Sequence, residues 1–165
     1  LNLKDGASAS DFDWKVDGGD GWVSVNNGVV KFTGEGTSSK VTITVTPKTG
    51  GGNAAKYSFN LKTWFVYNDT KRSWPDANTY CQRLKMSLPT IGQFTNGWVG
   101  HDASRAVNSL WSEWGDIKSY GLANLDSWTS EAASGSTHYV VNLYYGDVSS
   151  DSDSTSGVVM CQRGL

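Results

Sequence analysis

The spacing of apolar residues changes near residue 64, and this change constrains the fold more than any other feature of the sequence. Before it, apolar and polar residues alternate, as in 12–17, 41–46 and 57–62. A period of two places the apolar side chains on one face of a β-strand and leaves the other face in water. We therefore predict an all-β sandwich for residues 1–64.

Turn-forming residues separate the predicted strands. Glycine-rich segments lie at 18–21, 34–36 and 50–53. The dipeptide Asn27-Gly28 lies between the apolar segments 23–25 and 30–32. Because both residues accept the positive φ of a type I′ turn, this dipeptide predicts a β-hairpin.

After residue 68 the apolar spacing becomes helical. Ser73 is a predicted N-cap, with Pro75 in the first turn and Asp76 at the third helical position. The apolar stripe then predicts a helix that runs down to Pro89. Its members are Trp74, Ala77, Cys81, Leu84 and Leu88.

A second helix is predicted from another apolar stripe, with Asp102 as its N-cap and Gly115 as its stop. The stripe consists of Ala103, Ala106, Val107, Leu110, Trp111 and Trp114. Thr90 and Gln93 can open an earlier helical turn, which two nearby glycines weaken.

The period returns to two beyond residue 120. Val141, Leu143 and Tyr145 alternate with Asn142 and Tyr144, and a Gly146-Asp147 turn follows. Residues 157–161 predict a last strand that ends on a cysteine.

Cys81 and Cys161 are the two cysteines of the chain. They do not form the closely spaced pairs of zinc or redox motifs. In a polar chain rich in serine and threonine they favour one disulfide made outside the cytoplasm, and two reduced core thiols are the alternative. The chain-entropy argument gives such a bridge about 4 to 5 kcal/mol of stabilisation.

The charge balance and hydropathy exclude two kinds of partner. With 14 basic and 16 acidic residues the net charge is -2, so the chain lacks the basic excess that nucleic-acid binding needs. No apolar run approaches the ~20 residues of a membrane helix. The first residues do not form a signal peptide, and we expect the chain to be a piece of a longer protein.

Five segments of the second part carry a resemblance to a known family. They are 73–81 (SWPDANTYC), 88–90 (LPT), 127–130 (SWTS), 139–143 (YVVNL) and 158–161 (VVMC). They resemble the C-terminal domain of the intimin/invasin family of outer-membrane adhesins. The order of a helix with Cys81, a second helix, strands and a terminal Cys161 also resembles the C-type-lectin-like fold. The first part, most visibly 22–30, resembles the bacterial immunoglobulin-like repeats of the stalks of these adhesins.

The resemblance implies two modules. Residues 1–64 would form a bacterial Ig-like β-sandwich, and because about 60 residues is short for that module we expect a first strand to be missing. Residues 65–165 would form an α+β C-type-lectin-like domain with one disulfide between Cys81 and Cys161. The chain would lie outside the bacterial cell as part of an outer-membrane protein, with its anchoring barrel absent from this sequence.

The family also implies a function. Sugar-binding members of the wider fold hold Ca²⁺ with Glu-Pro-Asn or Gln-Pro-Asp and with Trp-Asn-Asp, and neither pattern occurs here. We therefore expect a calcium-independent adhesin tip that binds a host or neighbouring-cell protein as a monomer, with no cofactor and no metal. A carbohydrate-recognition module is one alternative. A structural or self-associating cap of the stalk is another.

Exposure and composition suggest where such a partner would bind. Core packing accounts best for Trp14, Trp74, Trp111, Trp114 and Trp128. Trp98 and Trp22, beside glycines, are the better candidates for exposed contacts, although a structural role is favoured over a binding role for each. The segments 97–102 and 147–156 are the expected contact surface. Its candidate residues are Trp98, His101, Asp102, Asp147, Asp151 and Asp153. The acidic run lacks the glycine and terminal glutamate of an EF-hand, so a solvated loop is favoured over an ion site.

The sequence lacks the motifs of an enzyme. His101 and His138 are the two histidines, and neither accompanies a Gly-x-Ser-x-Gly or His-Glu-x-x-His pattern. Glu113 and Glu131 could pair as in a glycosidase, but nothing in the sequence brings them together. We predict no catalytic residues.

Overall fold

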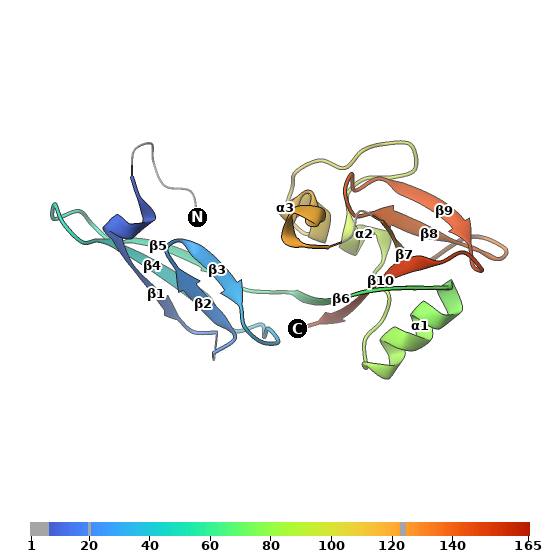
Figure 1. The fold of residues 1–165 in the computed structure, drawn as a ribbon, viewed down its shortest axis with the longest axis horizontal. Coiled ribbons are helices and arrows are strands. Elements are labelled where there is room, and N and C mark those ends of the chain that lie inside the picture. The colour runs from blue at the N-terminus through green and yellow to red at the C-terminus, as the bar shows by residue number, and fades with distance from the viewer. Residues whose placement is uncertain (1–6, 20, 123–124) are drawn as a thin grey trace. The chain divides into compact units, whose positions relative to one another are not determined.

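The computed structural model describes residues 7–19, 21–122 and 125–165 (Figure 1). The chain divides into two compact units, residues 1–64 with 164–165 and residues 65–163. The expectation about the first residues and part of the predicted turn at 18–21 fall outside the described residues.

The first unit consists of two small antiparallel sheets. A short 3-10 turn, η1 (Ala9–Asp11), is capped by the Ser8 side chain and leads into the strands. The three-stranded sheet has the order β1-β4-β5, and β2 pairs with β3. The strands are β1 (Phe12–Asp17), β2 (Val23–Asn26), β3 (Val29–Phe32), β4 (Val41–Pro47) and β5 (Ala55–Phe59).

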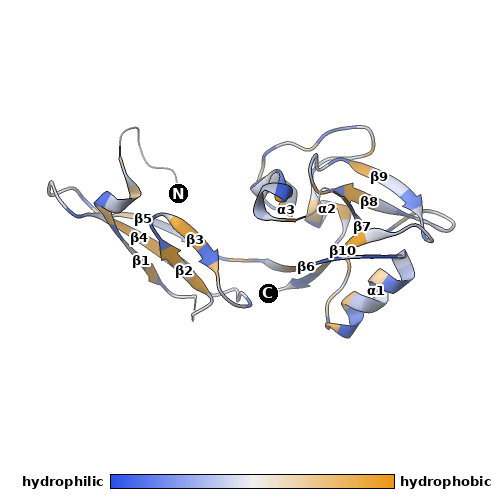
Figure 2. Ribbon diagram, viewed as in Figure 1, coloured by the Kyte–Doolittle hydropathy of each residue, from blue (hydrophilic) through white to orange (hydrophobic). Residues whose placement is uncertain are grey.

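The alternation of the sequence places the core of the first unit. In β1 every second residue is half-buried, and β4 buries Val41 and Ile43 completely. Figure 2 shows this alternation of apolar and polar residues as changes of colour along the strands. β5 differs, because Tyr57 is 53% exposed. As the last strand of its sheet, β5 has a paired neighbour on one side only, so less of its apolar face is covered.

The predicted hairpin at Asn27-Gly28 is confirmed. β2 and β3 pair in a register that brings Asn26 opposite Val29. Asn27 has φ 45° and Gly28 has φ 77°, the positive values of a two-residue type I′ connection.

Trp22 is a core residue, which agrees with the structural role favoured for it and removes it as a candidate for an exposed contact. Only 4% of its surface is accessible, and it packs with Val23 and Val41. Its backbone N–H donates to the Gly19 carbonyl at 2.7 Å, and its indole N–H donates to Thr37 Oγ1 at 3.2 Å. The glycines before Trp22 form a tight turn that returns the chain to the core, and they do not form an open loop.

The second unit is built on a five-stranded sheet of order β6-β10-β7-β8-β9. β10 runs parallel to β7, whereas β7, β8 and β9 are antiparallel neighbours. The strands are β6 (Thr63–Arg72), β7 (Asp126–Ser134), β8 (Thr137–Asn142), β9 (Val148–Ser152) and β10 (Gly157–Gly164). The helices are α1 (Trp74–Arg83), α2 (Ile91–Phe94), α3 (Leu110–Trp114) and the 3-10 turn η2 (Ile117–Tyr120).

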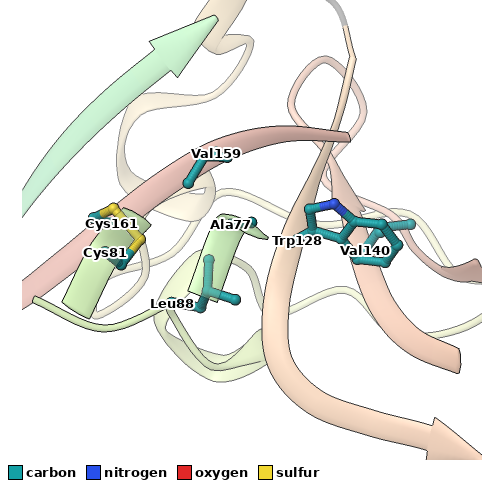
Figure 3. Packing of buried hydrophobic residues seen from close by; sticks show 7 residues of the cluster. All are labelled: Ala77, Cys81, Leu88, Trp128, Val140, Val159 and Cys161. Carbon is teal, nitrogen blue, oxygen red and sulfur yellow. A yellow bond between two sulfur atoms is a disulfide. The ribbon is translucent and has the colours of Figure 1, made fainter. Parts of the chain in front are cut away.

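The sheet of the second unit separates two apolar cores. Alternate residues of β10 contribute to different sides: Val159 and Cys161 join one core, and Val158 and Met160 join the other. The first core contains α1 residues and the fully buried Trp128, as Figure 3 shows. Phe94 of α2 belongs to the second core. A strand with both faces buried reads as a continuous apolar run, as residues 158–161 do.

The predicted disulfide is confirmed. Cys81 on α1 and Cys161 on β10 are bonded, and both are fully buried in the first core (Figure 3). The bond joins an early element of the unit to its last strand.

The start of α1 is as predicted, but its end is not. The Ser73 hydroxyl accepts the Asp76 backbone N–H at 3.4 Å. The helix ends at Arg83 and does not reach Pro89, because Lys85 adopts φ 57°. Leu88 is nevertheless buried, and the neighbouring Ser87 pairs with Gln162.

The other helices are short. The turn that Thr90 and Gln93 suggested forms α2, with both capping-box bonds present. The predicted helix from Asp102 is wrong: α3 begins at Leu110, after Asn108 adopts φ 87°. Its stop at Gly115 is confirmed. Trp114 is 42% exposed, which corrects its assignment to the core, since a helix of five residues covers little of its neighbours.

The strand pattern after residue 136 also differs in part from the prediction. β8 ends at Asn142, so Tyr145 lies in the turn and is 58% exposed. The segment 147–156, predicted as a solvated loop, contains β9, which pairs with β8 from Thr137↔Ser152 to Val141↔Val148. The serine and aspartate content concealed this strand because an edge strand needs few apolar residues.

Candidate functional site

Exposed apolar side chains gather in one stretch of the second unit. Ten large apolar side chains are exposed among the described residues, and six of these lie between 98 and 145. These six are Trp98, Val99, Val107, Trp114, Tyr120 and Tyr145. Exposed aromatic residues grouped on connections between elements are typical of binding surfaces.

Trp98 and His101 form the base of a tight hairpin, which we call the 97–102 hairpin (Gly97 to Asp102). Their backbones exchange two hydrogen bonds, of 3.3 Å from Trp98 N–H and 3.0 Å from His101 N–H. Their rings lie 4.8 Å apart between centroids. Gly100 adopts φ 79° in the turn. Trp98 is 65% exposed and Val99 60%.

A buried threonine fixes the base of the hairpin. Thr95, 2% exposed, donates its hydroxyl to the Gly146 carbonyl at 2.6 Å and accepts the Gly97 N–H at 2.9 Å. A Cβ at Gly97 would lie 2.6 Å from the same Gly146 carbonyl, so the close approach requires glycine. The hairpin is therefore tied to the turn between β8 and β9.

A second link joins the hairpin to the sheet. Val99 forms a parallel bridge with Val148, the first residue of β9. In Figure 1 the connection between α2 and α3 accordingly arches beside the start of β9. The Val99–Val148 bridge and the two Trp98–His101 backbone hydrogen bonds together hold the backbone that carries the exposed Trp98.

The turn next to the hairpin is also held in place. The Trp111 indole N–H donates to the Tyr144 carbonyl at 3.1 Å, and Gly146 packs so closely on Trp111 that a Cβ there would collide. Tyr144 and Tyr145 are in edge-to-face contact at 4.5 Å. Tyr145 thus adds a second positioned aromatic ring one residue from the Gly146 anchor.

The acidic candidates divide into two groups. Asp102 is exposed and belongs to the hairpin. Asp151 and Asp153 are half-buried, which corrects the expectation that they are solvated. Asp151 accepts hydrogen bonds from the Ser152 N–H and the Thr155 hydroxyl, and Asp153 lies 2.7 Å from His138 Nδ1. Both carboxylates hold the connection from β9 to β10.

Asp147 lies between these groups. It is half-buried beside the hairpin, and its Oδ1 is buried without a hydrogen-bond partner among the described residues. It immediately precedes Val148, which is bridged to Val99 of the hairpin, and its carboxylate is less accessible than that of Asp102.

The structure also brings together residues that the sequence did not associate. The His138 ring stacks on Trp74 at 3.6 Å while it contacts Asp153. Val99 and Tyr145 join the exposed surface; the one signal for Val99 was its position between Trp98 and Gly100. Tyr145 was hidden because its spacing continued the alternation of β8.

Two kinds of feature are absent from the described parts of the chain. No helix among them is long and apolar enough to span a bilayer. No group of three or more His, Cys, Asp or Glu side chains within the described ranges could hold a metal ion.

Comparison with known proteins identifies relatives of the chain. Residues 1–59 match the family model described as "Invasin, domain 4". The inverse autotransporter adhesin YeeJ of Escherichia coli (strain K12) is 32% identical over 154 residues, which cover 90% of this chain. The chain is homologous to intimin/invasin-family adhesins. This confirms the resemblance seen in the sequence, and the homology supports an adhesin role.

This chain spans a small part of the length of YeeJ, because the matched region is 6% of that protein. YeeJ is an inverse autotransporter adhesin, and this homology is consistent with the extracellular position that the sequence predicted for the chain. The disulfide is in keeping with that position, because such bonds persist in oxidising compartments.

Solved structures show that the fold is shared with the intimin/invasin family. Invasin, described as a bacterial integrin-binding protein, matches with a TM-score of 0.77 and 22% identity over 95% of this chain and 31% of invasin. An intimin mutant from EHEC O157:H7 matches with a TM-score of 0.58 and 14% identity over 93% of this chain and 78% of that chain. The mostly-β fold with few helices and one disulfide therefore resembles both.

Proposed function

We propose that this chain is the tip of a bacterial surface adhesin, and that it binds a protein on a host or neighbouring cell through the surface around the 97–102 hairpin. The observation that carries the proposal is Trp98: a large aromatic side chain that is 65% exposed on a hairpin tied to the β8–β9 turn through Thr95 and to β9 through Val99. Aromatic residues held rigidly at a surface are the residues that dominate protein interfaces. Homology to adhesins supports the same role.

The two units would have different tasks. In our proposal residues 1–64 are an Ig-like stalk module, supported by the two packed sheets and by the match of residues 1–59 to invasin domain 4. Residues 65–165 are a C-type-lectin-like binding module, supported by the Cys81–Cys161 disulfide between α1 and β10. The chain acts as a monomer, which sedimentation of the purified protein would test.

We further propose that binding is calcium-independent and that the chain is not catalytic. The exposed candidates of the hairpin are an indole, an imidazole and one carboxylate, Asp102, whereas calcium sites use six to eight oxygen ligands. Asp151 and Asp153, the other acidic candidates, are already engaged in hydrogen bonds within the protein.

Adhesion of protein-coated beads to cultured epithelial cells tests the proposal. We expect adhesion to survive a calcium chelator and glycosidase treatment of the cells, and to disappear after protease treatment. Trp98→Ala should reduce adhesion at least about tenfold, because truncation of a central aromatic contact has an effect of this size. Tyr57→Ala removes an exposed aromatic ring from the first unit and serves as the matched control.

The other outcomes separate the alternatives. Adhesion that requires calcium and cell-surface glycans would indicate carbohydrate recognition. Beads that adhere only to one another would indicate a self-associating cap. Equal adhesion of the two variants and the wild type would remove the hairpin from the binding surface.

A further inference from the structure

The β9 edge, one of the two edges of the main sheet, is mostly closed to an added strand. β9 is an edge strand of this sheet and pairs with β8 on its inner side. The Asn142 N–H donates to the Asp147 carbonyl at 3.0 Å, so alternate β9 residues, starting at Val148, point their backbone groups away from β8. Val148 is bridged by Val99, and the Ser152 N–H and carbonyl are satisfied by Asp151 and Thr155. Of the three outward-facing β9 residues, Ser150 is the one whose backbone groups have no such contact within the described parts of the chain.

A partner must therefore be recognised at this surface by side chains. Strand addition needs a row of free backbone groups, and one residue does not supply it. Trp98 is the most exposed aromatic side chain of the described residues. The face of an indole ring attracts cations more strongly than the ring of any other side chain.

The charges around the hairpin favour a cation on that ring. Asp102 is exposed four residues from Trp98, and the half-buried Asp147 lies immediately before β9, whose first residue is bridged to the hairpin. Arg105 is the first basic residue after the hairpin in the sequence, and its guanidinium donates to the carbonyls of Trp111 and Glu113. Lys118 lies over the Tyr144 ring. Acidic groups of the surface are therefore available, whereas its basic groups are already directed to other partners.

The second unit as a whole has the same sign. Residues 65–163 contain seven Lys and Arg and ten Asp and Glu residues, and seven minus ten is a net charge of -3. A field of this sign attracts a basic partner and raises its rate of association.

We propose that the 97–102 hairpin holds an arginine or lysine side chain of the partner protein, with the cation over the Trp98 indole and beside the Asp102 carboxylate. The inference rests on the proposed function and names the chemical group that this function would recognise. Asp102 is the one carboxylate among residues 97–102, and His101 is in ring contact with Trp98.

Titration with short peptides tests this inference without knowledge of the receptor. The probes are acetyl-Gly-Arg-Gly-amide and its citrulline counterpart, which has nearly the same shape but no charge. The signal is the indole N–H resonance of Trp98 in the ¹⁵N-labelled wild-type chain, assigned by its loss in Trp98→Phe. We expect the arginine peptide to shift this resonance and the citrulline peptide to leave it in place.

Two variants and salt sharpen the result. Asp102→Asn should weaken the arginine peptide about two- to threefold, since an exposed ion pair contributes little more than this. Asp69→Asn removes an exposed carboxylate of β6 and should leave the affinity unchanged. Higher sodium chloride should weaken binding of the arginine peptide.

The inference would be overturned if neither peptide changes the chemical shift of the Trp98 indole N–H, or if both change it equally. If bead adhesion still depends on Trp98 in that case, the proposed function stands and the recognised group is apolar. If bead adhesion does not depend on Trp98, the proposed binding surface fails as well.

Discussion

The two units differ in how far their stabilising contacts reach along the chain. In the first unit, two of the three strand pairings join consecutive strands, β2 with β3 and β4 with β5. In the second unit, the disulfide joins residues 80 positions apart, and the Thr95 to Gly146 bond spans 51. Short-range pairing makes the first unit readable from local patterns, whereas long-range links decide which side chains of the second unit reach the surface.

Removal of the disulfide should have the largest effect and should be confined to the second unit. We expect Cys81→Ser with Cys161→Ser to cost about 4 to 5 kcal/mol, because the closed loop of 80 residues no longer restricts the unfolded chain. Denaturant unfolding followed by NMR would report each unit separately. The wild type after reduction is the control, and loss of first-unit signals at the same denaturant concentration would show that the units do not respond independently.

A core truncation in β4 is the counterpart in the first unit. Ile43 is 1% exposed, and Ile43→Ala should cost about 2 to 4 kcal/mol from lost burial and the cavity left behind. The unfolding midpoint of the first unit should fall while that of the second unit stays. Thr44→Ala, the next residue on the more accessible face, is the matched control, and an equal effect of both would contradict the assigned core.

Loss of one hydroxyl should release the 97–102 hairpin. Thr95→Val keeps the shape of the side chain but leaves the Gly146 carbonyl and the Gly97 N–H without their partner, at a cost of about 1 to 3 kcal/mol. Hydrogen exchange at Trp98 and His101 should accelerate. The exposed Thr33, which donates to the Gly21 carbonyl, provides the control Thr33→Val; unchanged exchange in Thr95→Val would show that the hairpin is held elsewhere.

A turn substitution in the first unit should have the smallest effect. Gly28 has φ 77°, and Gly28→Ala should cost about 1 kcal/mol because a side chain disfavours this conformation. Thermal unfolding of the first unit should shift slightly, and the second unit should not respond. Gly50→Ala in another positive-φ turn, where no atom approaches a new Cβ, should behave similarly; a much larger effect of Gly28→Ala would point to the Trp14 ring, 3.2 Å from its Cβ.

Some elements of the candidate site followed from the sequence. The Trp98 position between two glycines made it a candidate for exposure, Ser73 predicted the start of α1, and Thr90 with Gln93 indicated the turn that forms α2. These signals are local, since a cap or a turn depends on residues within one helical turn.

Other elements did not follow from it. Apolar spacing alone extended α1 to Pro89 and began the next helix at Asp102, because a stripe does not show where a residue with positive φ ends the helix. The acidic segment 147–156 concealed β9, and Trp22 lies in the core despite its glycine neighbours.

The amino-acid sequence by itself determined the alternating strands of the first unit, the hairpin at Asn27-Gly28 and the relationship to the intimin/invasin family. Only the tertiary structure decided that Val99 bridges Val148, that Thr95 binds the Gly146 carbonyl, and that Asp151 and Asp153 support a turn. The physical reason is range. Hydrogen-bond geometry between residues many positions apart depends on how the sheet is assembled, and no local pattern of residues records it.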